Sequence, residues 1–171
     1  MVREIVHTLG PGTRRTLEWG DPVTPTSRDG GDGWSNPTLL DTPDQLAAFT
    51  PAAAVGRGGR GAVTYYRFTD QPSPKGILPV DYWLATTDGP GTGFTHYHDI
   101  AGPFNIEAAS KAFGFLGDYE GLATVQNGTS FLPFFAHTNC EDRSCRAKGT
   151  PDGSPTGGPD PQDVAAWQVA P

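Results

Sequence analysis

The sequence contains little positive charge and no long apolar run. Lys and Arg number 12 against 19 Asp and Glu, which gives a net charge of −7 at pH 7. Nucleic-acid binding relies on basic patches that neutralise phosphates, so we expect no nucleic-acid partner. No stretch is apolar over the length that crosses a bilayer, and residues 1–7 hold no apolar run of signal-peptide length. The sequence therefore predicts no membrane span and no signal peptide in this chain.

Cysteine is scarce as well. Cys140 and Cys145 are the only two in the chain, and their close spacing is compatible with either a disulfide or two free thiols. A structural zinc site takes four Cys or His ligands, so two cysteines alone make a poor one. We therefore expect no bound metal and no cofactor.

Glycine and proline are abundant instead, at 23 and 17 residues. Both residue types favour turns and interrupt regular elements. Their abundance therefore indicates short strands instead of long helices and predicts an all-β fold. Residues 141–171 are the richest in Gly, Pro and Asp, and we expect them to form a disordered tail with one helical turn near residues 164–169. The predicted organisation is a folded unit over residues 1–140 followed by this tail.

Strands are predicted where β-branched and aromatic residues cluster between turns. Asn127-Gly128 favours a two-residue hairpin turn, and residues 101–115 are expected to form a long connection. The expected strands cover residues 49–55, 62–68, 81–86, 94–100, 116–125 and 129–138.

One turn carries a recognisable motif, Ser27-Arg28-Asp29-Gly30-Gly31-Asp32-Gly33-Trp34. A short hydroxyl side chain and a carboxylate can bind backbone N–H groups inside a tight hairpin turn. Glycines supply the positive φ angles that such a turn needs, and the Trp ring is expected to be buried against the hairpin. A weaker version follows at residues 86–94, with Asp88 placed 59 positions after Asp29. A period of this length, carrying about four strands, is typical of one propeller blade.

The first motif resembles the Asp-box of sialidases and their relatives, with Gly33 in place of the usual Thr. Further segments strengthen the likeness: Phe49-Thr50-Pro51, Val63-Thr64-Tyr65-Tyr66, Asp81-Tyr82-Trp83 and Phe115-Leu116-Gly117-Asp118-Tyr119-Glu120-Gly121-Leu122. Over residues 27–140 the chain is similar to the C-terminal part of bacterial sialidase-like Asp-box (BNR-repeat) β-propellers. The resemblance implies a partial β-propeller of two to three four-stranded antiparallel blades with Asp-box hairpins. Propellers have about four to eight blades, so self-assembly is one way to complete the ring.

The same resemblance implies an exo-α-sialidase type of glycoside hydrolase that acts on terminal sugars of glycans, in a parent protein located outside the cell or on its surface. Such a site needs three arginines on the substrate carboxylate, because guanidinium pairs with carboxylate in two hydrogen bonds. It also needs a Tyr nucleophile assisted by a Glu, and an Asp as acid and base.

Propeller topology places Asp-box turns between the third and fourth strands, opposite the central binding site, so Asp29 and Asp88 are expected to be structural. The binding face instead collects residues at the other strand ends. There we expect Asp118 and Glu120 as catalytic residues, with Arg67, Tyr66 and Tyr119 contacting the substrate.

Alternatives remain for each of these residues. Tyr119 and Glu120 are adjacent, so on a strand they point to opposite faces and do not pair. Arg67 is the one arginine at a suitable place, but a solvated strand-end charge is the favoured explanation for it. Hydrogen bonds to neighbouring loops at the blade entry are likewise favoured over ligand contact for Asp118 and Tyr119. A non-catalytic Asp-box propeller module that binds carbohydrate or protein is therefore the second hypothesis, and a truncated product without function is a third.

Two further groups have structural interpretations. His96 and His98 alternate onto one strand face, where an exposed pair is favoured over a metal site without a third ligand. The aromatic residues Tyr65, Tyr66, Trp83 and Phe94 are expected to pack in the core, with an aromatic sugar platform as the alternative.

Overall fold

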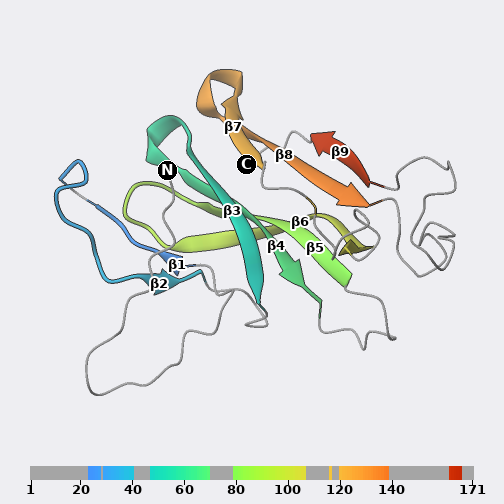
Figure 1. The fold of residues 1–171 in the computed structure, drawn as a ribbon. Coiled ribbons are helices and arrows are strands. Elements are labelled where there is room, and N and C mark those ends of the chain that lie inside the picture. The colour runs from blue at the N-terminus through green and yellow to red at the C-terminus, as the bar shows by residue number, and fades with distance from the viewer. Residues whose placement is uncertain are drawn as a thin grey trace, which may run out of the picture.

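The computed structural model describes residues 23–27, 29–40, 47–69, 79–106, 116, 120–138 and 162–166. These residues are mostly antiparallel β-sheet, which confirms the all-β class (Figure 1). The strands are β1 (Val23–Thr24), β2 (Thr38–Leu39), β3 (Ala48–Val55), β4 (Gly61–Phe68), β5 (Pro79–Thr87), β6 (Phe94–Asn105), β7 (Gly121–Val125), β8 (Ser130–Thr138) and β9 (Gln162–Ala166).

The strands form three sheets. A four-stranded meander, β3-β4-β5-β6, lies in the middle, between the small β1-β2 hairpin and the three-stranded sheet β7-β8-β9 (Figure 1). All neighbouring strands in these sheets are antiparallel. Within the described residues the sheets form an open array, and no closed ring of blades is present.

The two central strands of the middle sheet, β4 and β5, are buried on both faces. β4 is covered on both sides, because six consecutive residues from Ala62 to Arg67 are buried. Successive side chains alternate between the faces of a strand, so Tyr66 and Tyr82 enter one apolar cluster while Tyr65 and Ala85 enter another. Each buried aromatic or aliphatic side chain contributes roughly 1.5–3 kcal/mol, and the sheet is thus stabilised from two sides.

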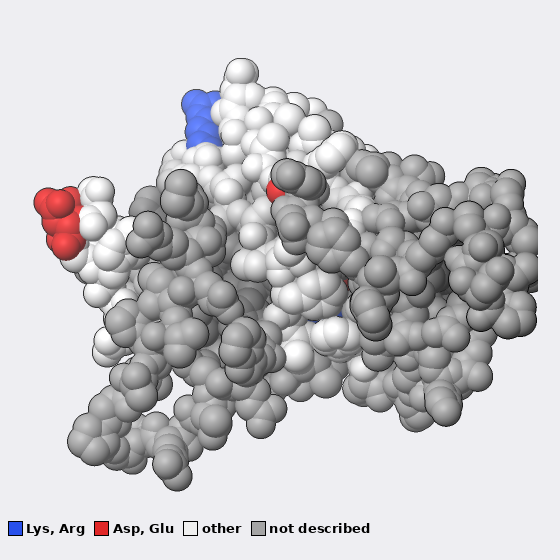
Figure 2. All heavy atoms as spheres, in the orientation of Figure 1, with Lys and Arg blue, Asp and Glu red and all other residues white. Residues whose placement is uncertain are grey.

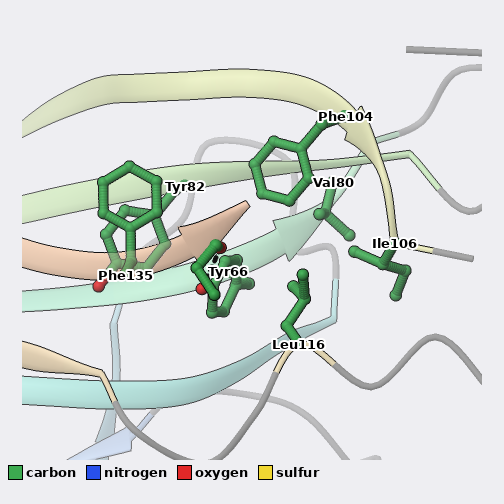
Figure 3. Packing of buried hydrophobic residues seen from close by; sticks show 8 residues of the cluster. Tyr66, Val80, Tyr82, Phe104, Ile106, Leu116 and Phe135 are labelled. Carbon is green, nitrogen blue, oxygen red and sulfur yellow. Dashed lines mark hydrogen bonds between the residues drawn. The ribbon is translucent and has the colours of Figure 1, made fainter. Parts of the chain in front are cut away.

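Aromatic rings join the central sheet to β8. The rings of Tyr82 and Phe135 stack with centroids 3.9 Å apart, and the Tyr66 ring lies 4.6 Å from that of Tyr82. Figure 3 shows Tyr82 lying over Phe135 of β8, with Tyr66 next to them and Val80 and Phe104 farther along the same cluster. The Tyr66 hydroxyl donates a hydrogen bond of 2.7 Å to the Ala136 carbonyl oxygen. Hydrophobic burial and this buried hydrogen bond therefore dock the second sheet on the first.

Three hairpin turns meet at one end of the sheets. The Gly61 N–H, at the start of β4, donates to Oγ1 of Thr87, at the end of β5. A Cβ placed on Gly56 would lie 2.7 Å from the carbonyl oxygen of Gly128, so the β3–β4 and β7–β8 turns touch through their backbones. β4 therefore ends, and β5 begins, at the opposite end of the central sheet.

Two expectations about strand limits were wrong. β6 continues through residues 101–105, where a connection was expected, because Phe104 packs into the core and Asn105 still pairs with Pro79 of β5. Residues 162–166 form β9 instead of a helical turn, because β8 offers a free edge with which their backbone pairs. The rest of the predicted tail lies outside the described residues.

Gly128→Ala is expected to destabilise the protein more than Gly58→Ala. The two glycines have φ angles of 82° and 73°, so each alanine costs about 1–2 kcal/mol of left-handed backbone strain. A Cβ on Gly128 would also lie 2.8 Å from the backbone nitrogen of Arg57, whereas a Cβ on Gly58 meets no described atom within 4 Å. Urea denaturation of both variants measures the difference, and equal losses would contradict the contact between the turns.

Candidate functional site

The site residues expected from the sequence gather at the end of the sheets opposite the three turns. Arg67 of β4 pairs in register with Asp81 of β5, and Glu120 stands immediately before β7. Tyr66 precedes Arg67 on the same strand. Asp118 and Tyr119 lie outside the described residues. Topology thus brings Arg67, Tyr66 and Glu120 to one end of the fold.

Arg67 is held inside the protein, with 6% of its surface exposed. Its guanidinium carbon lies 4.1 Å from the centre of the Trp83 ring, within the range of a cation–π interaction. One guanidinium nitrogen lies 3.7 Å from a carboxylate oxygen of Asp81, an ion-pair distance too long for a good hydrogen bond. Arg67 is therefore neither a solvated strand-end charge nor a group presented to a ligand in solution.

The ionised form of Asp81, which pairs with this arginine, is disfavoured by its surroundings. Burial raises the pKa of the Asp81 carboxyl, and repulsion from Asp99 raises it further, while the nearby Arg67 charge acts in the opposite direction. Asp99 is opposite Trp83 on β6, in a stretch where the pairing of β5 and β6 shifts register. This register shift brings the Asp99 charge close to Asp81. No residue pattern in the sequence predicts the shift, so the sequence could not indicate that Asp99 lies near this site.

Tyr66 and Glu120 form a second group. Tyr66 is fully buried, and burial followed by the neighbouring Glu120 charge raises the pKa of its hydroxyl far above the ordinary value. The hydroxyl is already used as a donor to the Ala136 carbonyl. A tyrosine in this state is a poor nucleophile, because ionisation is disfavoured and no substrate atom can reach it.

Tyr66 and Arg67 point to opposite faces of the sheet. Tyr66 packs on Tyr82, and Arg67 packs on Trp83. Adjacent residues on a strand point to opposite faces. In the sequence-based prediction this rule was applied to Tyr119 and Glu120 but was not applied to Tyr66 and Arg67. The two residues expected to contact a substrate together therefore do not line one surface.

The Asp-box turn forms as its residues predict. The Ser27 hydroxyl donates to the Asp29 carboxylate and accepts from the Gly31 N–H, both at 2.8 Å. The same carboxylate oxygen accepts the Gly33 N–H at 2.9 Å. Gly30 and Gly31 take the expected positive φ angles of 80° and 105°. The motif is thus a self-contained hydrogen-bonded turn of the β1-β2 hairpin.

One expectation about this turn was wrong. The Trp34 ring does not become buried, because 63% of its surface stays exposed. Its indole N–H donates to the Gly31 carbonyl oxygen at 3.1 Å. The turn therefore fixes the ring while leaving it in solvent.

The second, weaker motif has a different hydrogen-bonding pattern. Asp88 accepts from the Thr95 hydroxyl at 3.1 Å and lies 2.7 Å from Nε2 of His96, so it binds side chains of β6 where Asp29 binds backbone N–H groups. His96 and His98 are both exposed, as expected. The aromatic residues Tyr65, Tyr66, Trp83 and Phe94 all pack in the core clusters, as expected.

Other classes of site have no counterpart among the described residues. Their His, Cys, Asp and Glu side chains form no group of three or more that could hold a metal ion. None of their helical segments has the length and apolar character needed to span a bilayer. Cys140 and Cys145 lie outside the described residues.

Comparisons with known proteins add no assignment. No family model, curated protein or solved structure matches this chain. The likeness to Asp-box propellers therefore rests on the motif residues of the sequence.

Arg67→Met is expected to lower the free energy of unfolding by about 3–5 kcal/mol at pH 7, because it leaves the buried Asp81 carboxylate without its partner. Loss of the Arg67 charge also raises the pKa of Asp81 further. A carboxyl with a raised folded-state pKa destabilises the protein as pH rises from its ordinary value of 3.8. The deficit should therefore be smaller at pH 4 than at pH 7.

Urea unfolding at both pH values measures this difference, with Arg67→Lys as the charge-preserving control. A deficit that is the same at both pH values would contradict the proposed Arg67–Asp81 interaction.

Asp29→Ala is expected to open the β1-β2 turn without unfolding the central sheet. Hydrogen bonds from Gly33 and Ser27 lower the pKa of Asp29, so in the native protein the turn should hold at neutral pH and loosen only as acid protonates this carboxylate. Hydrogen exchange of the Gly33 amide by NMR reports the change. The matched control is Asp32→Ala, an exposed residue of the same turn, and comparable exchange in both variants would rule out the role of Asp29.

Proposed function

We propose that this chain is a non-catalytic module of an Asp-box β-propeller that binds carbohydrate. The observation that carries the proposal is the position of Arg67. A sialidase needs arginines that face a substrate carboxylate, but the guanidinium of Arg67 is buried between Trp83 and Asp81. Arg57, at the other end of the sheets, lies in the β3–β4 turn and cannot join it.

The arrangement of the sheets supports the propeller part of the proposal. A hairpin carrying an Asp-box precedes a complete four-stranded antiparallel meander, and a third sheet follows. This order fits the end of one blade, one whole blade and most of a third. The edge strand β3 contacts β7, the first strand of the next sheet, as inner strands of neighbouring blades do around a common axis.

A fragment of a sialidase-like glycoside hydrolase is the second candidate. One observation favours it, since the Glu120 carboxylate lies close enough to the Tyr66 hydroxyl to affect its pKa. Catalysis would require the substrate arginines to come from outside the described residues and the Tyr66 hydroxyl to become accessible. In either case we propose a glycan partner and an extracellular or cell-surface parent protein.

Two assays on the full chain separate the candidates. A 4-methylumbelliferyl α-sialoside tests hydrolysis, and an array of neutral and sialylated oligosaccharides tests binding. We expect glycan binding without fluorophore release, even at high protein concentration. Release that Glu120→Gln abolishes would overturn the non-catalytic assignment, and the absence of any glycan binding would overturn the binding function.

A further inference from the structure

We infer that Trp34 is a stacking platform for a neutral sugar ring. This inference rests on the proposed glycan-binding function and assigns it to the Asp-box hairpin. Trp34 and Phe134 are the two exposed aromatic side chains among the described residues, at 63% and 51%. Trp34 lies on the β1-β2 hairpin, which projects away from the central sheet (Figure 1).

The ring is fixed before any ligand arrives. Its only polar atom, the indole nitrogen, donates to the Gly31 carbonyl at 3.1 Å. A Cβ on Gly31 would lie 3.9 Å from the ring, so the indole rests against the turn backbone. The Ser27 and Asp29 hydrogen bonds hold that turn in shape. A ligand therefore meets a rigid carbon surface and does not have to order it, which reduces the entropic cost of binding.

The chemistry of this surface suits a sugar. One face of a pyranose ring presents C–H groups that pack on an indole, while its hydroxyl groups seek hydrogen-bond acceptors at the rim. Asp32, two positions before Trp34, is exposed and offers such an acceptor. Phe134 lacks such a setting, because its exposed neighbours across the sheet are apolar, as at Ala166.

Charge selects among sugars. Asp29 and Asp32 are exposed carboxylates in the same turn as Trp34, and Figure 2 shows acidic side chains at the projecting tip of this hairpin. The hydrogen bonds that lower the pKa of Asp29 favour its ionised form further. Like charges repel at close range, so an acidic sugar such as sialic acid is disfavoured. The platform therefore fits a neutral saccharide, unlike the substrate of a sialidase.

The test is an NMR titration of the ¹⁵N-labelled full chain with chitotriose and, separately, with 3′-sialyllactose. The Trp34 indole N–H signal is assigned by its loss in Trp34→Phe. We expect chitotriose to shift this signal and to bind more tightly than 3′-sialyllactose. Trp34→Ala should weaken chitotriose binding about five- to tenfold, the contribution of a well-placed aromatic contact.

Two variants separate stacking from structure. Trp34→Phe loses the hydrogen bond to Gly31 but keeps a ring, so its affinity should lie between those of the native protein and Trp34→Ala. Phe134→Ala, which removes the other exposed aromatic ring, should bind as the native protein does.

Three results would overturn the inference. Unchanged chitotriose binding in Trp34→Ala would place the sugar elsewhere and leave the proposed function intact. Tighter binding of 3′-sialyllactose would reject the neutral class. Movement of the Trp34 signal with protein concentration alone would identify a second copy of the chain as the occupant. If the native chain binds no saccharide, the proposed function itself fails.

Discussion

Burial of both faces of β4 and β5, the inner strands of the central sheet, is the constraint on which the rest of the structure depends. β4 has no solvent-facing side, because one face receives β8 and the other packs around Leu40, which follows β2. The stacked Tyr82 and Phe135 rings form the centre of the first contact. A sheet of this kind cannot stand alone in water, and its neighbours are therefore integral to the fold rather than additions to it.

This constraint determines what the site can do. Because each side of β4 faces protein, its polar residues are drawn into internal contacts. Tyr66 donates to a carbonyl of β8, while Arg67 packs on Trp83 beside Asp81. Tyr66 and Arg67, which were expected to contact a substrate, therefore make internal contacts that hold the sheets together. The exposed aromatic ring to which we assign sugar binding lies instead on the projecting hairpin, at Trp34.

Much of the local structure could be predicted from residue patterns. The Asp-box turn follows from the reach of Ser27 and Asp29 to nearby backbone N–H groups, and the glycines permit the required φ angles. The strands β3, β4, β5 and β8 follow from clustered β-branched and aromatic residues. The placement of Arg67, Asp81 and Glu120 at one end follows from antiparallel order. These features depend on contacts within a hairpin or on strand direction, both of which the sequence encodes directly.

The sequence by itself determined the all-β class, the hairpin positions and the end of the sheets at which the polar residues gather. Only the tertiary structure decided which face each side chain meets and whether water reaches it. Arg67 was expected to face a ligand but is buried, and Trp34 was expected to be buried but is exposed. The reason is physical, since exposure depends on which sheet or loop covers a residue. That covering comes from segments distant in the chain, such as β8 against β5, and no local pattern specifies it.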